Sequence, residues 1–191
     1  MAELGALAKP QSRALQVALP HGGLSMNLRY LAICAALAVL PAASAADSVY
    51  KDPPGRFTLS VPGGWRAAPQ DTGGMGGVQL THDASWLLVG PFGGARDGSD
   101  AVAQLTKQFE AQYQSLTAVA SGASKVGGQP AVFASFDAVN SHGARIILTL
   151  TGIDSSSAGV FVVISAAPKR EAEAFKPVLE RICDSVRWLE P

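Results

Sequence analysis

The chain has 191 residues, of which 48% are hydrophobic and 16% charged, and its 15 lysine and arginine residues balance 15 aspartate and glutamate residues. So few and so evenly balanced charges offer no basic surface for nucleic acid and no polybasic patch for a membrane, and the apolar content excludes a disordered chain. The length favours one domain. Two cysteines, Cys34 and Cys183, are too few for a disulfide framework or a zinc site.

Residues 26–45 have the three-part pattern of a secretory signal peptide. Arg29 supplies the basic region, residues 31–40 form an apolar run, and Ala43 and Ala45 are the small residues that a signal peptidase requires. The apolar run is too short for a bilayer, which takes about 20 residues to span. The pattern predicts cleavage after Ala45, and a membrane anchor that is never removed is the alternative.

Residues 1–25 show no sustained hydrophobic period and precede a segment that works from the N-terminus. We interpret them as a mis-annotated extension, with translation starting at Met26; a mitochondrial presequence is the rival interpretation, because the stretch is basic. Cleavage would leave one domain, residues 46–191, with 12 of the 15 basic residues, 14 of the 15 acidic residues and Cys183 alone. This mature protein is expected to be periplasmic or secreted, with no membrane span.

The mature chain opens with a proline-rich lead-in and a strand. Residues 52–55 read Asp-Pro-Pro-Gly, which marks the start of the domain. Apolar and polar residues then alternate over residues 56–61, which predicts a half-buried strand. A Pro-Gly-Gly turn ends this strand, and Trp65 follows it in a position to cover the edge of a sheet.

A glycine-rich stretch separates this strand from a hairpin. Residues 66–77 are polar, with a Gly-Gly-Met-Gly-Gly tip at residues 73–77, and are expected to form a mobile surface loop. Residues 78–81 and 86–90 are apolar segments on either side of a polar turn, which predicts a β-hairpin.

From Ser99 the spacing of apolar residues changes to three and four, which predicts a helix with Ser99 or Asp100 as its N-cap. The residues of its apolar stripe are Val102, Leu105, Phe109, Tyr113 and Leu116.

Four strand segments and a second helix follow. The strands are expected at residues 117–126, 131–139, 144–153 and 159–166. The last two are apolar at both odd and even positions and should be central strands covered on both faces. Residues 169–189 have helical spacing, and Pro177 predicts either a kink or a second helix that starts near it.

The order of elements is strands, helix, strands, helix, without the alternation typical of a parallel sheet. It predicts an α+β fold, an α/β/α sandwich with a mainly antiparallel sheet of about six strands and a helix on each face.

The first strand and the last helix resemble those of the PsbP-like family, which includes Mog-type and DcrB-type domains. Phe57, Leu59, Pro62 and Trp65 match the opening pattern F-x-hydrophobic-x-x-P-x-x-W. In the last helix an apolar pair precedes Ser185 and a further apolar residue, as in the terminal helix of that family. The resemblance implies an α/β/α sandwich in a docking or assembly factor without known catalytic residues, so no functional residue is carried over and photosynthesis is not implied.

No set of residues forms a recognisable catalytic, cofactor or metal motif. His82 and His142 lie in predicted turns with Ser and Asp neighbours, and His82, Asp83, His142 and Met75 share no spacing that would fix a metal. We therefore expect neither catalytic residues nor a cofactor.

The residues expected to contact a partner or ligand are Trp65, Met75, Trp86 and Trp188. The leading hypothesis is an exported, non-catalytic domain that binds or helps to assemble another envelope protein. The alternative is a periplasmic small-ligand-binding protein that uses a cleft between sheet and helix, lined by Trp65, Trp86, Phe109 and Tyr113. A hydrolase is the third hypothesis.

Overall fold

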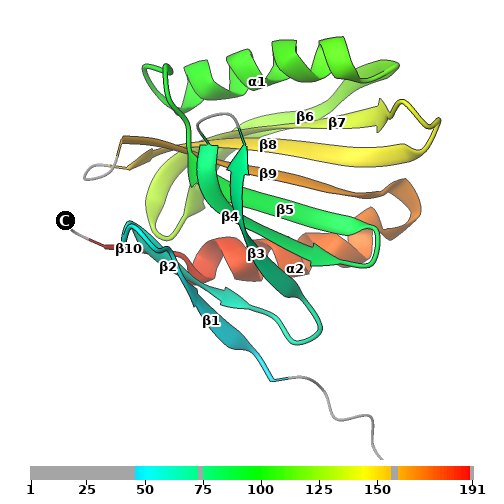
Figure 1. The fold of residues 1–191 in the computed structure, drawn as a ribbon. Helices are drawn as coiled ribbons and strands as arrows, with labels where there is room; N and C mark the ends of the chain where they lie inside the picture. The colour runs from blue at the N-terminus through cyan, green and yellow to red at the C-terminus, as the bar shows by residue number, and fades with distance from the viewer. Residues whose placement is uncertain (1–45, 73–74, 156–158, 190–191) are drawn as a thin grey trace, which may run out of the picture. The chain divides into compact units, whose positions relative to one another are not determined.

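The computed structural model describes residues 46–72, 75–155 and 159–189. Their main element is a seven-stranded antiparallel sheet (Figure 1). The strands, in their order across the sheet, are β3 (Arg66–Thr72), β4 (Met75–His82), β5 (Ser85–Pro91), β9 (Gly159–Pro168), β8 (Arg145–Ser155), β7 (Gln129–Val139) and β6 (Ser115–Val126). The two segments that are apolar at both parities, β8 and β9, lie inside the sheet, which confirms the prediction for central strands.

One face of the sheet is covered by α1 (Gly98–Gln112), which lies along it in Figure 1. Ala101 and Leu105 are buried between helix and sheet, and their neighbours on the strands include Leu148 and Leu150. The helix begins and ends earlier than expected. Its N-cap is Asp97, whose side chain accepts a hydrogen bond from the Asp100 backbone N–H at 2.8 Å.

The predicted stripe of α1 therefore loses its last two members. Tyr113 is the C-cap and Leu116 lies in β6, because the chain turns at residues 113–114 to enter the sheet. Tyr113 and Leu116 continue the helical spacing of apolar residues by chance, although the helix has already ended at Gln112.

The opposite face carries α2 (Ala172–Ser185) and a small antiparallel sheet of three strands. These strands are β1 (Ser48–Lys51), β2 (Phe57–Val61) and β10 (Arg187–Trp188), with β2 in the middle. The buried residues on this side include Phe57, Leu59 and Phe161, and α2 contributes Ile182 as its one buried residue.

The last segment is not one helix over residues 169–189. It begins as a 3₁₀ turn, η1 (Lys169–Glu171), continues as α2, and ends as β10 because Arg187 and Trp188 pair with β2. Pro177 lies inside α2 and does not start a second helix.

The prediction of a mobile surface loop at residues 66–77 is wrong. These residues belong to the β3–β4 hairpin, in which Arg66 lies opposite Thr81 and Thr72 opposite Met75. Only the tip of the hairpin, Gly73 and Gly74, lies outside the described residues. The strand lacks apolar alternation because β3 is an edge strand with exposed side chains. This hairpin raises the main sheet from about six strands to seven. The predicted α+β class, with a helix on each face, is confirmed.

Neither α1 nor α2, the two α-helices that the structure describes, is long and apolar enough to cross a membrane. The predicted signal peptide, residues 26–45, and the predicted extension, residues 1–25, lie outside the described residues.

Candidate functional site

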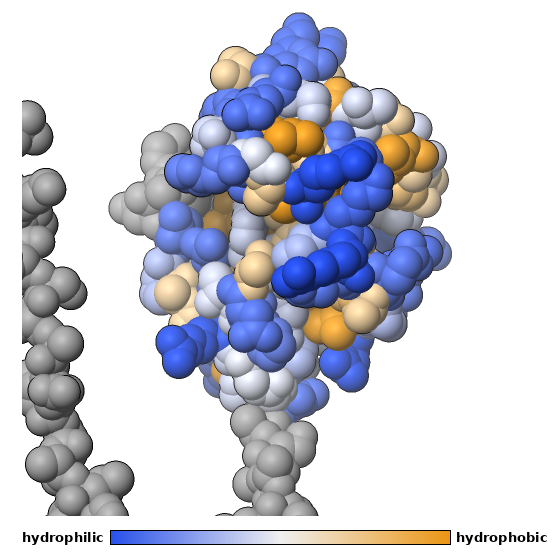
Figure 2. Space-filling model, turned by 90° about the vertical axis from the view of Figure 1, so that its right-hand side faces the viewer, coloured by the Kyte–Doolittle hydropathy of each residue, from blue (hydrophilic) through white to orange (hydrophobic). Residues whose placement is uncertain are grey.

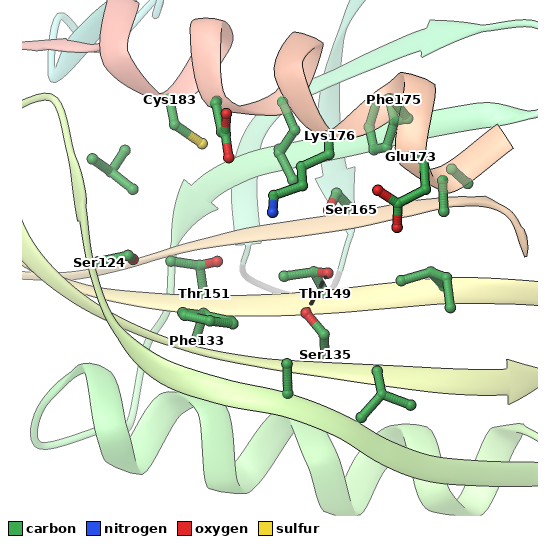
Figure 3. A pocket seen from close by; sticks show the side chains of 18 of the residues that line it. Ser124, Phe133, Ser135, Thr149, Thr151, Ser165, Glu173, Phe175, Lys176 and Cys183 are labelled. Atoms are coloured by element: carbon green, nitrogen blue, oxygen red, sulfur yellow. Dashed lines mark hydrogen bonds between the residues drawn. The ribbon is translucent and has the colours of Figure 1, made fainter.

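A cleft of about 550 Å³ lies between α2 and the sheet, over β6 to β9 (Figure 3). The end of α2 near β2 packs on the core through its buried Ile182. The residues that line the cleft include Ser124, Phe133, Ser135, Thr149, Thr151, Ser165, Glu173, Phe175, Lys176, Leu179 and Cys183.

The floor of the cleft is a row of hydroxyl groups that crosses three neighbouring strands. The strand register places Ser135 of β7 opposite Thr149 of β8, and Thr149 opposite Ser165 of β9. The Ser135 and Thr149 hydroxyl oxygens are hydrogen-bonded at 2.8 Å, while Ser165 and Thr151 are buried. Because hydroxyls both donate and accept, this floor can bind backbone amides or other neutral polar groups.

The opposite wall comes from α2. Glu173 and Lys176 extend from the helix toward the sheet, and Phe175 and Cys183 flank them (Figure 3). The wall thus offers the carboxylates of Glu173, Glu180 and Asp184 and the Lys176 ammonium group as well as apolar surface.

An aromatic stack supports Phe175 from outside the cleft. The Trp65 ring stacks on Phe175 with 5.7 Å between centroids and on His82 with 5.5 Å. Trp65 therefore joins the β2–β3 turn and the end of β4 to α2 and fixes the position of Phe175.

Cys183 is the one cysteine among the described residues, and its environment makes it a poor nucleophile. Burial, and to a smaller extent the nearby carboxylates of Asp184 and Glu180, raise the pKa of the Cys183 thiol to about 12. The thiolate is the reactive form, so this thiol is inert near neutral pH.

The side of the cleft formed by β6 carries small side chains. Ser124 pairs with Ala131, which points into the core on the α2 side, so alternation places Gly122 and Ala120 on the same face. Gly122 lies opposite Phe133, and a Cβ there would be 3.3 Å from the Phe133 ring. The Phe133 ring therefore lies beside the edge strand with no bulky β6 side chain over it.

One end of the domain, with the β7–β8 turn and the start of α2, is strongly polar. Figure 2 shows hydrophilic side chains there around separate small hydrophobic patches. Asp137 bonds to both Lys169 and Arg145, and these hydrogen bonds lower the pKa of its carboxyl group. This surface is an exposed ion-pair network rather than an apolar interface.

The four predicted contact residues are not brought together. Trp65 reaches the cleft only through Phe175, and Trp86 packs against the α1 side of the sheet. Trp188 donates its indole N–H to the Val126 carbonyl at 3.1 Å. Met75 begins β4, and its side chain lies outside the described residues.

The prediction that Trp65, Trp86, Phe109 and Tyr113 together line a cleft is wrong. Trp86, Phe109 and Tyr113 pack against the core on the α1 side, and the cleft lies on the α2 side. The hydroxyl row was not predicted, although one signal for it was present: Thr149, Thr151 and Ser165 interrupt otherwise apolar strands.

The two histidines lie far apart in the fold. His82 is the last residue of β4, with Nδ1 3.5 Å from a carboxylate oxygen of Asp83, and His142 is in the β7–β8 turn; both are exposed. Over residues 46–72, 75–155 and 159–189, no three His, Cys, Asp or Glu side chains gather in a way that could hold a metal ion.

No family model matches the chain, and neither does any curated protein. Among solved structures, it is similar to cyanobacterial PsbP from Synechocystis sp. PCC 6803, with a TM-score of 0.53 and 11% identity over 83% of this chain and 98% of that one. For LpqN, involved in cell envelope biogenesis of Mycobacterium tuberculosis, the TM-score is 0.52 and the identity 14%, over 75% of this chain and 90% of LpqN. For the Saccharomyces cerevisiae Ran-binding protein Mog1p, the TM-score is 0.52 and the identity 12%, over 75% of this chain and 96% of Mog1p.

At sequence identities this low, the similarity shows a shared fold and nothing about function. The shared fold extends over nearly the whole of each of the three other proteins. The resemblance of the opening strand and the last helix is thereby confirmed: the chain has the PsbP-like fold.

Proposed function

We propose that the chain is an exported, non-catalytic domain that binds another protein of the cell envelope, or assists its assembly, through the cleft between α2 and the sheet. The observation that carries this proposal is the composition of the cleft. Its polar groups are hydroxyls, the two lysines Lys125 and Lys176, and carboxylates, and its thiol is held protonated. Such groups suit recognition of a polypeptide better than attack on a bond.

Two further observations support the proposal. The signal-peptide pattern at residues 26–45 favours export. Among proteins of the same fold, LpqN is described as involved in cell envelope biogenesis and Mog1p as a Ran-binding protein.

Trp65 belongs to the proposed contact region through its stack on Phe175. Met75, Trp86 and Trp188 remain predicted contacts, and single alanine variants of each, compared with the wild type for formation of the partner complex, test them.

The proposal is tested by site-specific photo-cross-linking in the cell of origin. A photoreactive amino acid replaces Ser124 in the cleft or, as the control, Gln108 on the exposed side of α1. We expect one discrete adduct with an envelope protein from position 124 and none from position 108. No adduct at 124, or the same adducts from both positions, would contradict the proposal.

Export is tested separately by intact mass. The protein recovered from the envelope or the medium should begin at Ala46, and a mass that includes residues 26–45 would show that cleavage does not occur.

The second candidate function is binding of a small ligand in the same cleft, favoured by its volume of about 550 Å³ and its hydroxyl floor. Native mass spectrometry of protein purified from its own cells separates the two functions. A bound small molecule, released on denaturation and able to raise the melting temperature when added back, would favour this candidate.

A further inference from the structure

We infer that the free edge of β6 accepts an added β-strand, formed by an extended segment of the partner that carries large apolar side chains at alternate positions. The inference rests on the proposed function and deepens it, because it names the form and chemistry of the partner segment.

The outer edge of β6 is unpaired among the described residues. β6 ends the main sheet and pairs with β7 from Ser115 opposite Val139 to Val126 opposite Gln129, and no other described strand lies beyond it. Backbone N–H and C=O groups of alternate residues therefore point outward in a row along this strand of 12 residues, as far as its last residue, Val126, whose carbonyl accepts the Trp188 indole N–H. Only another extended backbone satisfies such a row in register.

The two edges of the sheet differ in composition. β3, at the other edge, carries the exposed Arg66 and Pro69, and charges and proline are the usual devices that prevent an edge from pairing. β6 has no proline, and its only charged residue is Lys125, next to its end. One edge of this sheet is thus protected and the other is open.

The regular part of β6 is its second half. The register with β7 shifts between Ala118 and Ala120, so a bulge at Val119 interrupts the strand, and Val119 is 56% exposed. Beyond the bulge the pairing is regular over residues 120–126. These seven residues are long enough for a typical strand of five to six residues to pair with them.

The small side chains of residues 120–124 leave space beside the cleft, and this space is the reason why we expect large apolar residues at alternate positions of the partner segment. Ala120, Gly122 and Ser124 face the cleft. Neighbouring strands lie about 4.8 Å apart, so large side chains on an added strand can reach across these small ones to Phe133. A second copy of residues 120–124, which read Ala-Ser-Gly-Ala-Ser, would bring only small residues to the contact and leave the cleft unfilled, which favours a partner of different sequence.

The probe for this inference is a display library of random ten-residue peptides selected on the purified domain. We expect enriched sequences with large apolar residues at positions i, i+2 and i+4. Enrichment of helical spacing, or failure to enrich any motif, would overturn the inference.

Two matched lysine variants then locate the site. Ala120→Lys places a charge on the open edge, and Ala68→Lys places one at an exposed position of the protected edge. For the peptide selected most strongly, Ala120→Lys should weaken binding at least about tenfold, because a long charged side chain would enter the space that the peptide's apolar side chains fill, and Ala68→Lys should change it less than about twofold. Equal effects of the two variants would contradict the assignment to β6.

A scan of the peptide itself does not depend on how the variants fold. In strand addition, alternate peptide N–H groups bond to the sheet, so N-methylation at positions of one parity should abolish binding and at the other parity should leave it intact. Equal effects at both parities would refute strand pairing. If the cross-link from position 124 forms while the peptide tests fail, the proposed function stands and strand addition is wrong; if neither is observed, both fail.

Discussion

Replacement of Ile182 by alanine tests whether one side chain anchors the wall of the cleft. Ile182 is 0% exposed and is the one buried residue of α2, while its neighbours Val178, Leu179 and Cys183 are only partly buried. Val178, Leu179 and the Phe175–Trp65 stack add partly exposed contacts, so Ile182 is the one fully buried anchor of the helix.

The expected loss follows from this burial. Truncation of a buried isoleucine to alanine costs about 2–5 kcal/mol, and a value of about 3 kcal/mol suits a site bordered on one side by a cleft that can relax. For a domain of this size, each kcal/mol lowers the melting temperature by about 2–4 °C, so the variant should melt about 6–12 °C below the wild type.

Urea unfolding followed by tryptophan fluorescence measures the loss, and hydrogen exchange should show that the amides of α2 exchange faster than those of α1. Ile182→Val should cost about 0.5–1.5 kcal/mol. Arg181→Ala, one residue away and exposed, should stay within about 0.5 kcal/mol of the wild type. A loss below about 1 kcal/mol for Ile182→Ala would refute the claim that this side chain anchors α2.

Three further outcomes are expected. A Cβ at Gly152 would lie 2.0 Å from the Gly98 carbonyl oxygen, so Gly152→Ala should cost about 1–3 kcal/mol or more in urea unfolding, whereas Gly93→Ala, where a Cβ meets nothing within 4 Å, should be nearly neutral. Because the pKa of the Cys183 thiol is raised to about 12, Ellman's reagent should react with it at pH 8 only after unfolding, and stability should fall as the pH rises from about 9 toward 12; rapid reaction of the folded protein would contradict this. Hydrogen bonds from the neighbouring lysine and arginine lower the pKa of Asp137, so its contribution to stability is present above about pH 4 and is lost as the pH falls through the folded value. Asp137→Asn should therefore make acid unfolding less steep, and an unchanged pH profile would show that the ion pairs contribute nothing.

The strands that the sequence predicts well are those whose burial is decided locally. Alternation identified residues 57–61, and apolar runs identified the central strands β8 and β9, because their neighbours bury them on one or both faces. β3 was missed because an edge strand with exposed side chains needs no apolar pattern.

Other features depend on contacts that are distant in sequence. Arg187 and Trp188 have helical spacing with the residues before them, yet they pair with Thr58 and Phe57, more than a hundred residues earlier. Spacing within one segment carries no information about such a pairing, which only the assembled core creates.

The candidate site shows the same division. A large aromatic side chain makes each tryptophan a candidate contact, but the sequence does not show that Trp188 packs against Phe57 and Phe161 and donates to the Val126 carbonyl. The cleft is instead built from Ser and Thr residues on three strands, and their alignment follows from a strand register that the sequence does not specify.

Cross-linking from positions 124 and 108 in intact cells decides whether the cleft is the binding face, because it asks which side of the domain meets another protein. We predict an adduct with one envelope protein from position 124, at the border of the cleft and β6, and none from position 108 on α1. An adduct from position 108 alone, or equal labelling from both positions, would contradict the assignment of binding to the cleft.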